Sequence, residues 1–338
     1  MSKSIYTLLL LISWSSILFG QSTTSSSMEQ VGTSVANILK VGVGARSLAM
    51  GNAAVADCDD ISSLYWNAGA LARIEKNEII FHQSSWLVDS KIYFFGMGFI
   101  IPSVGTIGLS LHYFSSGDIE ETTLEYPEGT GRTFTADDFS VGITFSRKIT
   151  NRFSTGVTVK MIQESLDKEN AGTFAIDIGS VFTTNFLNNM RIGMSLSNLG
   201  GQMKFSGTDL AIQYTANPDN PTKVVQGSLE TDEWDIPLYF RFGLATEAFD
   251  NDKFRLTLSS EVMDSRDYIH RIAVGGEFSW IEMLFLRAGY QFNTDDTNFS
   301  VGGGLKLDLK WADFRLDYAY TNMGIFSDTQ KFSIIFAF

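Results

Sequence analysis

Apolar and polar residues alternate along most of the chain after residue 76, in runs of about ten residues separated by turns. The clearest run covers residues 311–320, where Asp313, Arg315 and Asp317 share one face of an extended strand and Phe314, Leu316, Tyr318 and Tyr320 share the other. One such run is ambiguous, because a soluble β-sandwich also has an apolar and a polar face. Many runs in succession predict an all-β membrane protein, an antiparallel transmembrane β-barrel.

We predict about fourteen strands, an even number as in bacterial single-chain barrels. They cover residues 77–87, 91–101, 105–115, 137–147, 151–164, 172–182, 189–197, 237–247, 252–262, 269–280, 283–293, 297–307, 311–320 and 330–338. The connectors alternate between short turns, such as 102–104 and 308–310, and a set that includes the long segments 116–136 and 198–236. Outer-membrane barrels place short turns in the periplasm and longer loops outside. We therefore expect both termini in the periplasm.

The polar face of most predicted strands carries one charged residue. An arginine that faced lipid at the membrane midplane would cost about 2–4 kcal/mol, so the charged face must line the lumen. The predicted lumen charge network consists of Lys160, Asp177, Arg191, Arg241, Arg255, Glu261, Arg271, Glu277, Arg287, Arg315 and Asp317. These residues either line a selective pathway or form ion pairs that fill the lumen, and we favour the ion pairs. Strands 77–87 and 91–101 are apolar on both faces, which predicts burial of both, against the segment before them.

The chain begins with features of a secretory leader. Residues 1–20 contain Lys3 and an apolar run that ends at a small residue, Gly20, as in a signal peptide. We interpret residues 21–33 as a flexible linker, 34–76 as a separate N-terminal segment and 77–338 as the barrel. Cys58 is the only cysteine, which excludes an internal disulfide, and it lies too far from the apolar run for a lipid anchor.

Charge and motif content exclude several functions. The net charge of −13 and the scattered basic residues argue against nucleic-acid binding. His82, His112 and His270 lack metal-ligand spacing, so we predict no metal site and no cofactor. No nucleophile elbow, catalytic triad or enclosed carboxylate pair is recognisable, so we do not expect an enzyme.

The N-terminal segment carries a specific signature. Its blocks are Leu39-Lys-Val-Gly-Val-Gly-Ala-Arg-Ser-Leu-Ala-Met-Gly51, then 53–57, then Leu64-Tyr-Trp-Asn-Ala-Gly-Ala-Leu-Ala72. They resemble the N-terminal signature of the PorV/PorQ group of outer-membrane proteins, within the FadL-like barrels. Ala68 stands where that group usually has proline, a departure that removes a fixed φ and keeps Trp66 and Asn67. The resemblance implies a barrel of 14 strands with residues 34–76 folded into the lumen as a plug.

Polar residues of this segment are candidates for gating, since a plug must make polar contacts with the barrel wall. The candidates are Arg46, Met50, Asp57, Asp59, Asp60, Trp66 and Asn67. The alternative, which we favour, is that the polar ones satisfy buried backbone and lumen charges and that Trp66 is a packing anchor.

Two functions follow from the resemblance. The first is a type IX secretion-associated component in the outer membrane of a Gram-negative bacterium. Its partners would be membrane lipid, secretion-system subunits and the C-terminal sorting domains of exported proteins, held at the outer loops. The alternative is a FadL-like channel for hydrophobic small molecules, which predicts an apolar pocket between plug and wall, lined by Leu48, Met50, Leu64 and Phe95.

Overall fold

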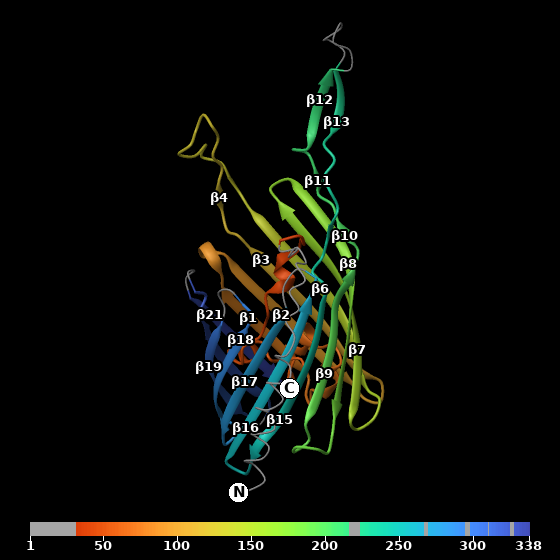
Figure 1. The fold of residues 1–338 in the computed structure, drawn as a ribbon, viewed down its shortest axis with the longest axis vertical. Helices are drawn as coiled ribbons and strands as arrows, with labels where there is room; N and C mark the ends of the chain where they lie inside the picture. The colour runs from red at the N-terminus through yellow and green to blue at the C-terminus, as the bar shows by residue number, and fades with distance from the viewer. Residues whose placement is uncertain (1–31, 216–223, 267–269, 295–297, 310, 325–327) are drawn as a thin grey trace, which may run out of the picture.

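Long antiparallel strands form a closed barrel in the computed structural model, which describes residues 32–215, 224–266, 270–294, 298–309, 311–324 and 328–338 (Figure 1). The predicted signal peptide and most of the predicted linker lie outside the described residues. The barrel strands are β1 (Glu78–Ser85), β2 (Lys91–Ile101), β3 (Gly105–Ser115), β6 (Ala136–Lys148), β7 (Phe153–Leu166), β8 (Glu169–Thr183), β9 (Arg191–Gly200), β15 (Tyr239–Asp250), β16 (Phe254–Ser265), β17 (Arg271–Trp280), β18 (Leu284–Phe292), β19 (Phe299–Asp308), β20 (Asp313–Thr321) and β21 (Thr329–Ala337). These fourteen confirm the predicted strands.

The barrel closes because its last strand pairs with its first. β1 pairs with β2 on one side and with β21 on the other, with Ile80 opposite Ile335. Backbone hydrogen bonds between Asn77 and Phe338 extend this pairing to the end of the chain. A closed barrel satisfies every strand edge internally, which is required where no water is present.

The outward face of the barrel is apolar and the inward face is polar. On β18, Leu286 points outward and is 66% exposed. Glu277 on the neighbouring strand β17 points inward and is 1% exposed. This is the inverse of a soluble protein, and it fits a barrel whose outer surface is covered by lipid.

The prediction that the strands at 77–87 and 91–101 are buried on both faces is wrong. Phe81, Phe95 and Phe99 point outward and are exposed, as on the other strands. Their inward neighbours are apolar because the N-terminal segment packs against them: Leu64 and Leu71 form one cluster with Ile80 and Phe94.

The connectors divide the barrel into two ends. One end, which we name the short-turn end, carries the turns between β2 and β3 and between β19 and β20, as well as Phe338. At the other, the long-connector end, two connectors project beyond the barrel (Figure 1). These connectors are expected as loops, but they contain short strand pairs. The pairs are β4 (Ile119–Glu120) with β5 (Thr133–Phe134), β10 (Gln202–Met203) with β14 (Trp234–Asp235) and β12 (Ala211–Thr215) with β13 (Val224–Ser228), while β11 (Ser206–Gly207) adds to β8.

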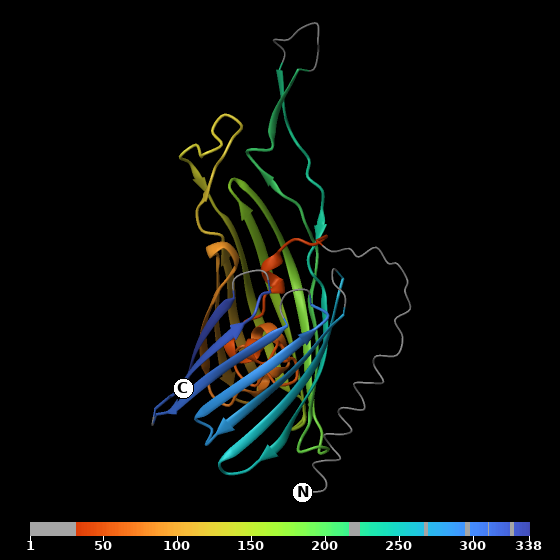
Figure 2. The same cartoon turned by 60° about the vertical axis from the view of Figure 1, so that its left-hand side comes forward.

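The N-terminal segment runs through the lumen from the long-connector end to the short-turn end (Figure 2). It begins beside the loop strand β14, where Val35 N donates to Asp235 O at 3.1 Å, and it leads into β1 at Asn77. Its short helices are η1 (Asn37–Lys40), α2 (Ala45–Ala49), α3 (Ser63–Trp66) and η2 (Ala70–Arg73), with η3 (Leu87–Asp89) following β1. No helix of the described residues is long and apolar enough to cross a membrane.

Candidate functional site: the N-terminal segment and the lumen

Glycines on the barrel wall allow the N-terminal segment to approach the strands directly. A Cβ at Gly289 on β18 would lie 2.1 Å from Gly51 N, and one at Gly179 on β8 would lie 2.1 Å from Asn67 Oδ1. Met50, one of the predicted gating residues, is buried against Gly289 and Gly275. The backbone of the segment therefore touches the wall at points where any side chain would collide.

Arg46 connects the segment to the wall. It lies in α2 and is buried. Its Nε donates to Glu277 Oε2 at 2.8 Å, and its Nη2 donates to Asp57 Oδ2 at 2.9 Å. Its Nη1 donates to Asp57 O at 2.8 Å and to Asp59 Oδ1 at 2.9 Å. Asp59 is half exposed, whereas Asp57 and Glu277 are as buried as Arg46. Two buried carboxylates therefore balance the positive charge of Arg46.

Glu277 lies at the centre of the lumen charges. Besides Arg46, it accepts from Arg287 Nε at 2.6 Å and from Arg255 Nη2 at 3.3 Å. Arg287 in turn donates from Nη1 to Asp317 Oδ1 at 2.6 Å. These charges alternate in sign and are mutually hydrogen-bonded, which is how charged groups are tolerated in a buried site.

Two further arginines extend the network to the acidic residues of the N-terminal segment. Arg315 Nε donates to Asp317 Oδ2 at 2.9 Å, and its Nη2 donates to Asp60 Oδ2. Arg191 Nη2 donates to Asp57 Oδ1, and its Nη1 donates to Glu247 Oε1 at 2.8 Å. The network therefore brings together Arg46, Asp57, Asp59 and Asp60 of the segment with the wall residues Arg191, Arg255, Glu277, Arg287, Arg315 and Asp317.

The other candidates occupy separate places. Arg241 lies over the ring of Trp66, 5.4 Å from its centroid, and 3.5 Å from Glu261 Oε1. Glu261 in turn accepts the backbone N–H groups of Ala54 and Val55, at 2.9 and 2.8 Å. Lys160 and Asp177 form a pair of their own at 2.8 Å.

Asn67 and Trp66 fix the fold of the segment. Asn67 Nδ2 donates to Val55 O at 2.8 Å and to Ser180 O on the wall at 3.0 Å. Its Oδ1 accepts the N–H of Gly69 at 3.0 Å. Trp66 is buried and donates from Nε1 to Val43 O at 2.8 Å. Every polar atom of these two side chains is used inside the segment or between the segment and the wall.

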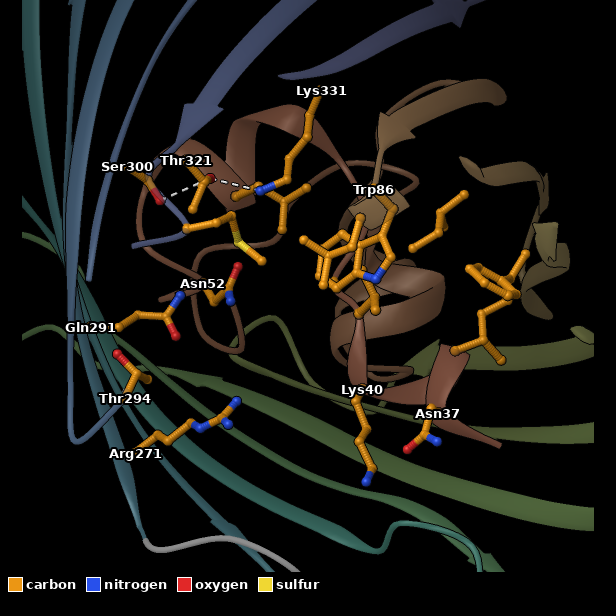
Figure 3. Close-up of a pocket in the computed structure, with 18 of the residues that line it drawn as sticks. Asn37, Lys40, Asn52, Trp86, Arg271, Gln291, Thr294, Ser300, Thr321 and Lys331 are labelled. Carbon is orange, nitrogen blue, oxygen red and sulfur yellow. Dashed lines mark hydrogen bonds between the residues drawn. The ribbon is translucent and has the colours of Figure 1, made fainter. Parts of the chain in front are cut away.

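A cavity of about 580 Å³ remains in the lumen, and its lining includes Trp86 after β1 and Thr294 after β18, at the long-connector end (Figure 3). Lys40, Leu48 and Asn52 of the N-terminal segment line one side, and Arg271 and Lys331 of the wall line the other. Arg271, which we predicted in the charge network, lies at this cavity. The predicted lining of the apolar pocket is wrong in part. Leu48 lines the cavity, but Phe95 faces outward and Leu64 packs against the wall at Gly108.

Several lumen residues are not among those predicted from the sequence. Glu247, Asn198 and Lys331 are at least partly buried and point inward, and the same alternation that located Arg241 would have found Glu247 and Lys331. Asn198 gave no signal, because its roles depend on partners distant in sequence: its N–H donates to Asp177 Oδ1 at 2.6 Å and its Nδ2 to Pro237 O at 2.6 Å.

The geometry defines a class of protein: an outer-membrane β-barrel of 14 strands, with an apolar outer face and a lumen occupied by its own N-terminal segment. The profile of the family described as type IX secretion system protein PorV matches residues 23–222. The chain belongs to the PorV family.

Solved structures with the same fold are FadL-like. A FadL homologue from Pseudomonas aeruginosa is similar at a TM-score of 0.54 and 11% identity, over 88% of this chain and 98% of that one. The Pseudomonas putida toluene transporter TodX is similar at a TM-score of 0.57 and 13% identity, over 87% of this chain and 97% of that one. The CymD monoaromatic hydrocarbon channel is similar at a TM-score of 0.55 and 13% identity, over 88% of this chain and 98% of that one. No curated protein matches, and at these identities the structural likeness establishes the fold alone.

Proposed function

We propose that the protein is a type IX secretion-associated component that holds exported proteins, through their C-terminal sorting domains, at the two long connectors. The connectors span residues 116–136 and 198–236. The single observation that carries the proposal is their projection beyond the barrel as paired strands, above a lumen through which the N-terminal segment runs (Figures 1 and 2). We name these two connectors the arms. Projecting arms, above a lumen that the N-terminal segment largely occupies, favour docking over passage. The role is binding, without catalysis.

The arms present apolar side chains to water. In the hairpin of β12 and β13, Tyr214 lies opposite Val225, and both are exposed. In the other arm, Leu124 is fully exposed beside Tyr126, and the two line a hollow of about 510 Å³. An isolated two-stranded hairpin is marginally stable in water, and exposed apolar patches typically mark interaction surfaces. These features support a protein partner that covers the arms.

The test removes one arm and leaves the barrel intact. Residues 211–228 would be replaced by a short Gly/Ser linker. In the control, the four residues 149–152 of a short turn would be replaced by four Gly/Ser residues. We expect exported proteins with C-terminal sorting domains to accumulate in the periplasm only in the arm variant, and to be lost from pull-downs. Normal secretion by a correctly inserted arm variant would contradict the proposal.

Uptake of hydrophobic small molecules is a second candidate, favoured by the cavity beneath the long-connector end. The fold that this chain shares with hydrocarbon channels is consistent with uptake. A deletion strain that secretes normally but takes up a hydrophobic substrate more slowly would favour uptake over secretion.

A further inference from the structure

Lys331 is a buried cation in an unusual setting. It lies on β21, points into the lumen and is 4% exposed. Its Nζ donates to Thr321 Oγ1 at 2.7 Å, and Thr321 Oγ1 lies 3.1 Å from Ser300 Oγ (Figure 3). A protonated amine has three donor hydrogens, and this bond uses one.

Lys160 and five arginines of the barrel wall, namely Arg191, Arg241, Arg255, Arg287 and Arg315, are paired with carboxylates. Arg287 lies 2.6 Å from Asp317, and Lys160 lies 2.8 Å from Asp177. For Lys331, no carboxylate among the described residues lies within 4.0 Å of Nζ. Burying a charge without a counter-charge is costly, so an anion beside Nζ would stabilise the charged form of Lys331.

The cavity offers room for that partner. Lys331, Thr321 and Ser300 form part of its wall, and its volume of about 580 Å³ is within the range of small-molecule sites. The same cavity is lined by the aromatic rings of Trp86 and Phe114 and by Met323. Asp138 also borders it, but on β6, which is separated from β21 by β1, β2 and β3. A cation at one side and aromatic surface at another match an amphipathic acid.

We propose that this cavity binds a small organic acid, whose carboxylate pairs with Lys331 Nζ and whose aromatic or branched body packs against Trp86 and Phe114. The carboxylate takes the amine hydrogens that Thr321 does not use. The apolar body covers the ring surfaces and excludes water from the ion pair. This site lies in the lumen, away from the arms, and does not depend on the role in secretion.

The test measures binding of 3-(4-fluorophenyl)propionate and of its neutral amide by ¹⁹F NMR to the full chain in nanodiscs, with empty nanodiscs subtracted. We expect the acid to bind and the amide to bind about tenfold more weakly or worse, because a charged hydrogen bond is lost. In Lys331→Met, affinity for the acid should fall by about tenfold or more. Lys91→Met, which removes an exposed lysine from β2, should bind the acid like the unchanged protein.

Stability provides a second readout that separates a binding residue from a structural one. Without ligand, Lys331→Met should unfold at the same or a higher temperature, since a buried charge without a counter-charge is removed. Lys160→Met, which removes the counter-charge of Asp177, should unfold at a lower temperature. Equal binding of acid and amide, no binding of the acid, or unchanged binding in a folded Lys331→Met variant would overturn the proposal.

Discussion

At the scale of single residues, the lumen reverses the usual relation between burial and charge. Asp60 is buried, and burial alone would raise its pKa. The charges of Arg315 and Arg46, with hydrogen bonds from Ser62 and Arg315, outweigh that effect and lower the pKa of Asp60 to about 2. Asp60 thus keeps its charge because Arg315 of the barrel and Arg46 of the segment lie close to it.

This shift predicts how the segment responds to acid. Because the pKa of Asp60 is below that of an unfolded aspartate, its contribution of about 2 kcal/mol is complete above about pH 4 and is lost as the pH falls through about 2. Cys58 is buried and lies two positions before Asp60 in the chain, so the rate at which its thiol reacts reports opening of the segment. We expect its reaction with 4,4′-dithiodipyridine, normalised to a cysteine peptide, to accelerate by about thirtyfold across this interval.

The matched variant is Asp60→Asn, which keeps the side-chain size and removes the charge. In this variant Cys58 should already react rapidly at neutral pH, with little further change in acid. A pH profile equal to that of the unchanged protein would contradict the role assigned to Asp60.

At the scale of elements, close contact between the segment and the wall depends on strand glycines that face inward. Gly289 on β18 and Gly275 on β17 face each other in the sheet, and both meet Met50. A strand interior normally disfavours glycine, and close backbone approach is the usual reason for its presence. The wall is therefore shaped to receive this particular segment.

Substituting Gly289→Ala should loosen the segment while the barrel still forms. The added Cβ would lie 2.1 Å from Gly51 N, and relieving that clash costs about 1–3 kcal/mol. Hydrogen exchange of the peptide 43–60 should rise, whereas peptides from the strands should stay protected. Ala288→Val adds bulk to the exposed face of the same strand and should leave exchange unchanged; equal protection in both variants would exclude the close-contact argument.

At the scale of the whole molecule, the path of the N-terminal segment determines on which side of the membrane it begins. Ser34 pairs with Asp235 and Ala36 N donates to Glu164 Oε2, both at the long-connector end, whereas Phe338 lies at the short-turn end. If the long connectors lie outside, as we predict, residue 33 at the start of the described segment lies outside as well. The N-terminus itself, which we expected in the periplasm, lies outside the described residues, and the periplasmic C-terminus stays a prediction.

Cysteine labelling on whole cells tests this orientation. Thr33→Cys should react with a membrane-impermeant maleimide, since Thr33 is exposed at the long-connector end. Asn151→Cys, which is exposed at a short turn, should react only after the outer membrane is permeabilised. The native Cys58 is buried and should contribute little background. Protection of Thr33→Cys in intact cells would contradict the external start.

The sequence by itself determined the barrel. Strict alternation requires two faces of opposite polarity, and a charge facing lipid costs too much, so strand number, the inward position of residues such as Glu277 and Arg287, and closure all follow from local pattern. The signature around Trp66 and Asn67 further indicated a segment inside the lumen.

Only the tertiary structure decided which charges meet and where space remains. The partners of Arg46 lie 11 and 231 positions away in the chain, and no local pattern encodes such a pairing. The cavity beside Lys331 exists because the segment fills one part of the lumen and leaves another open. Alternation determines which way a side chain points, whereas closure of the barrel and the path of the chain through it determine what it meets.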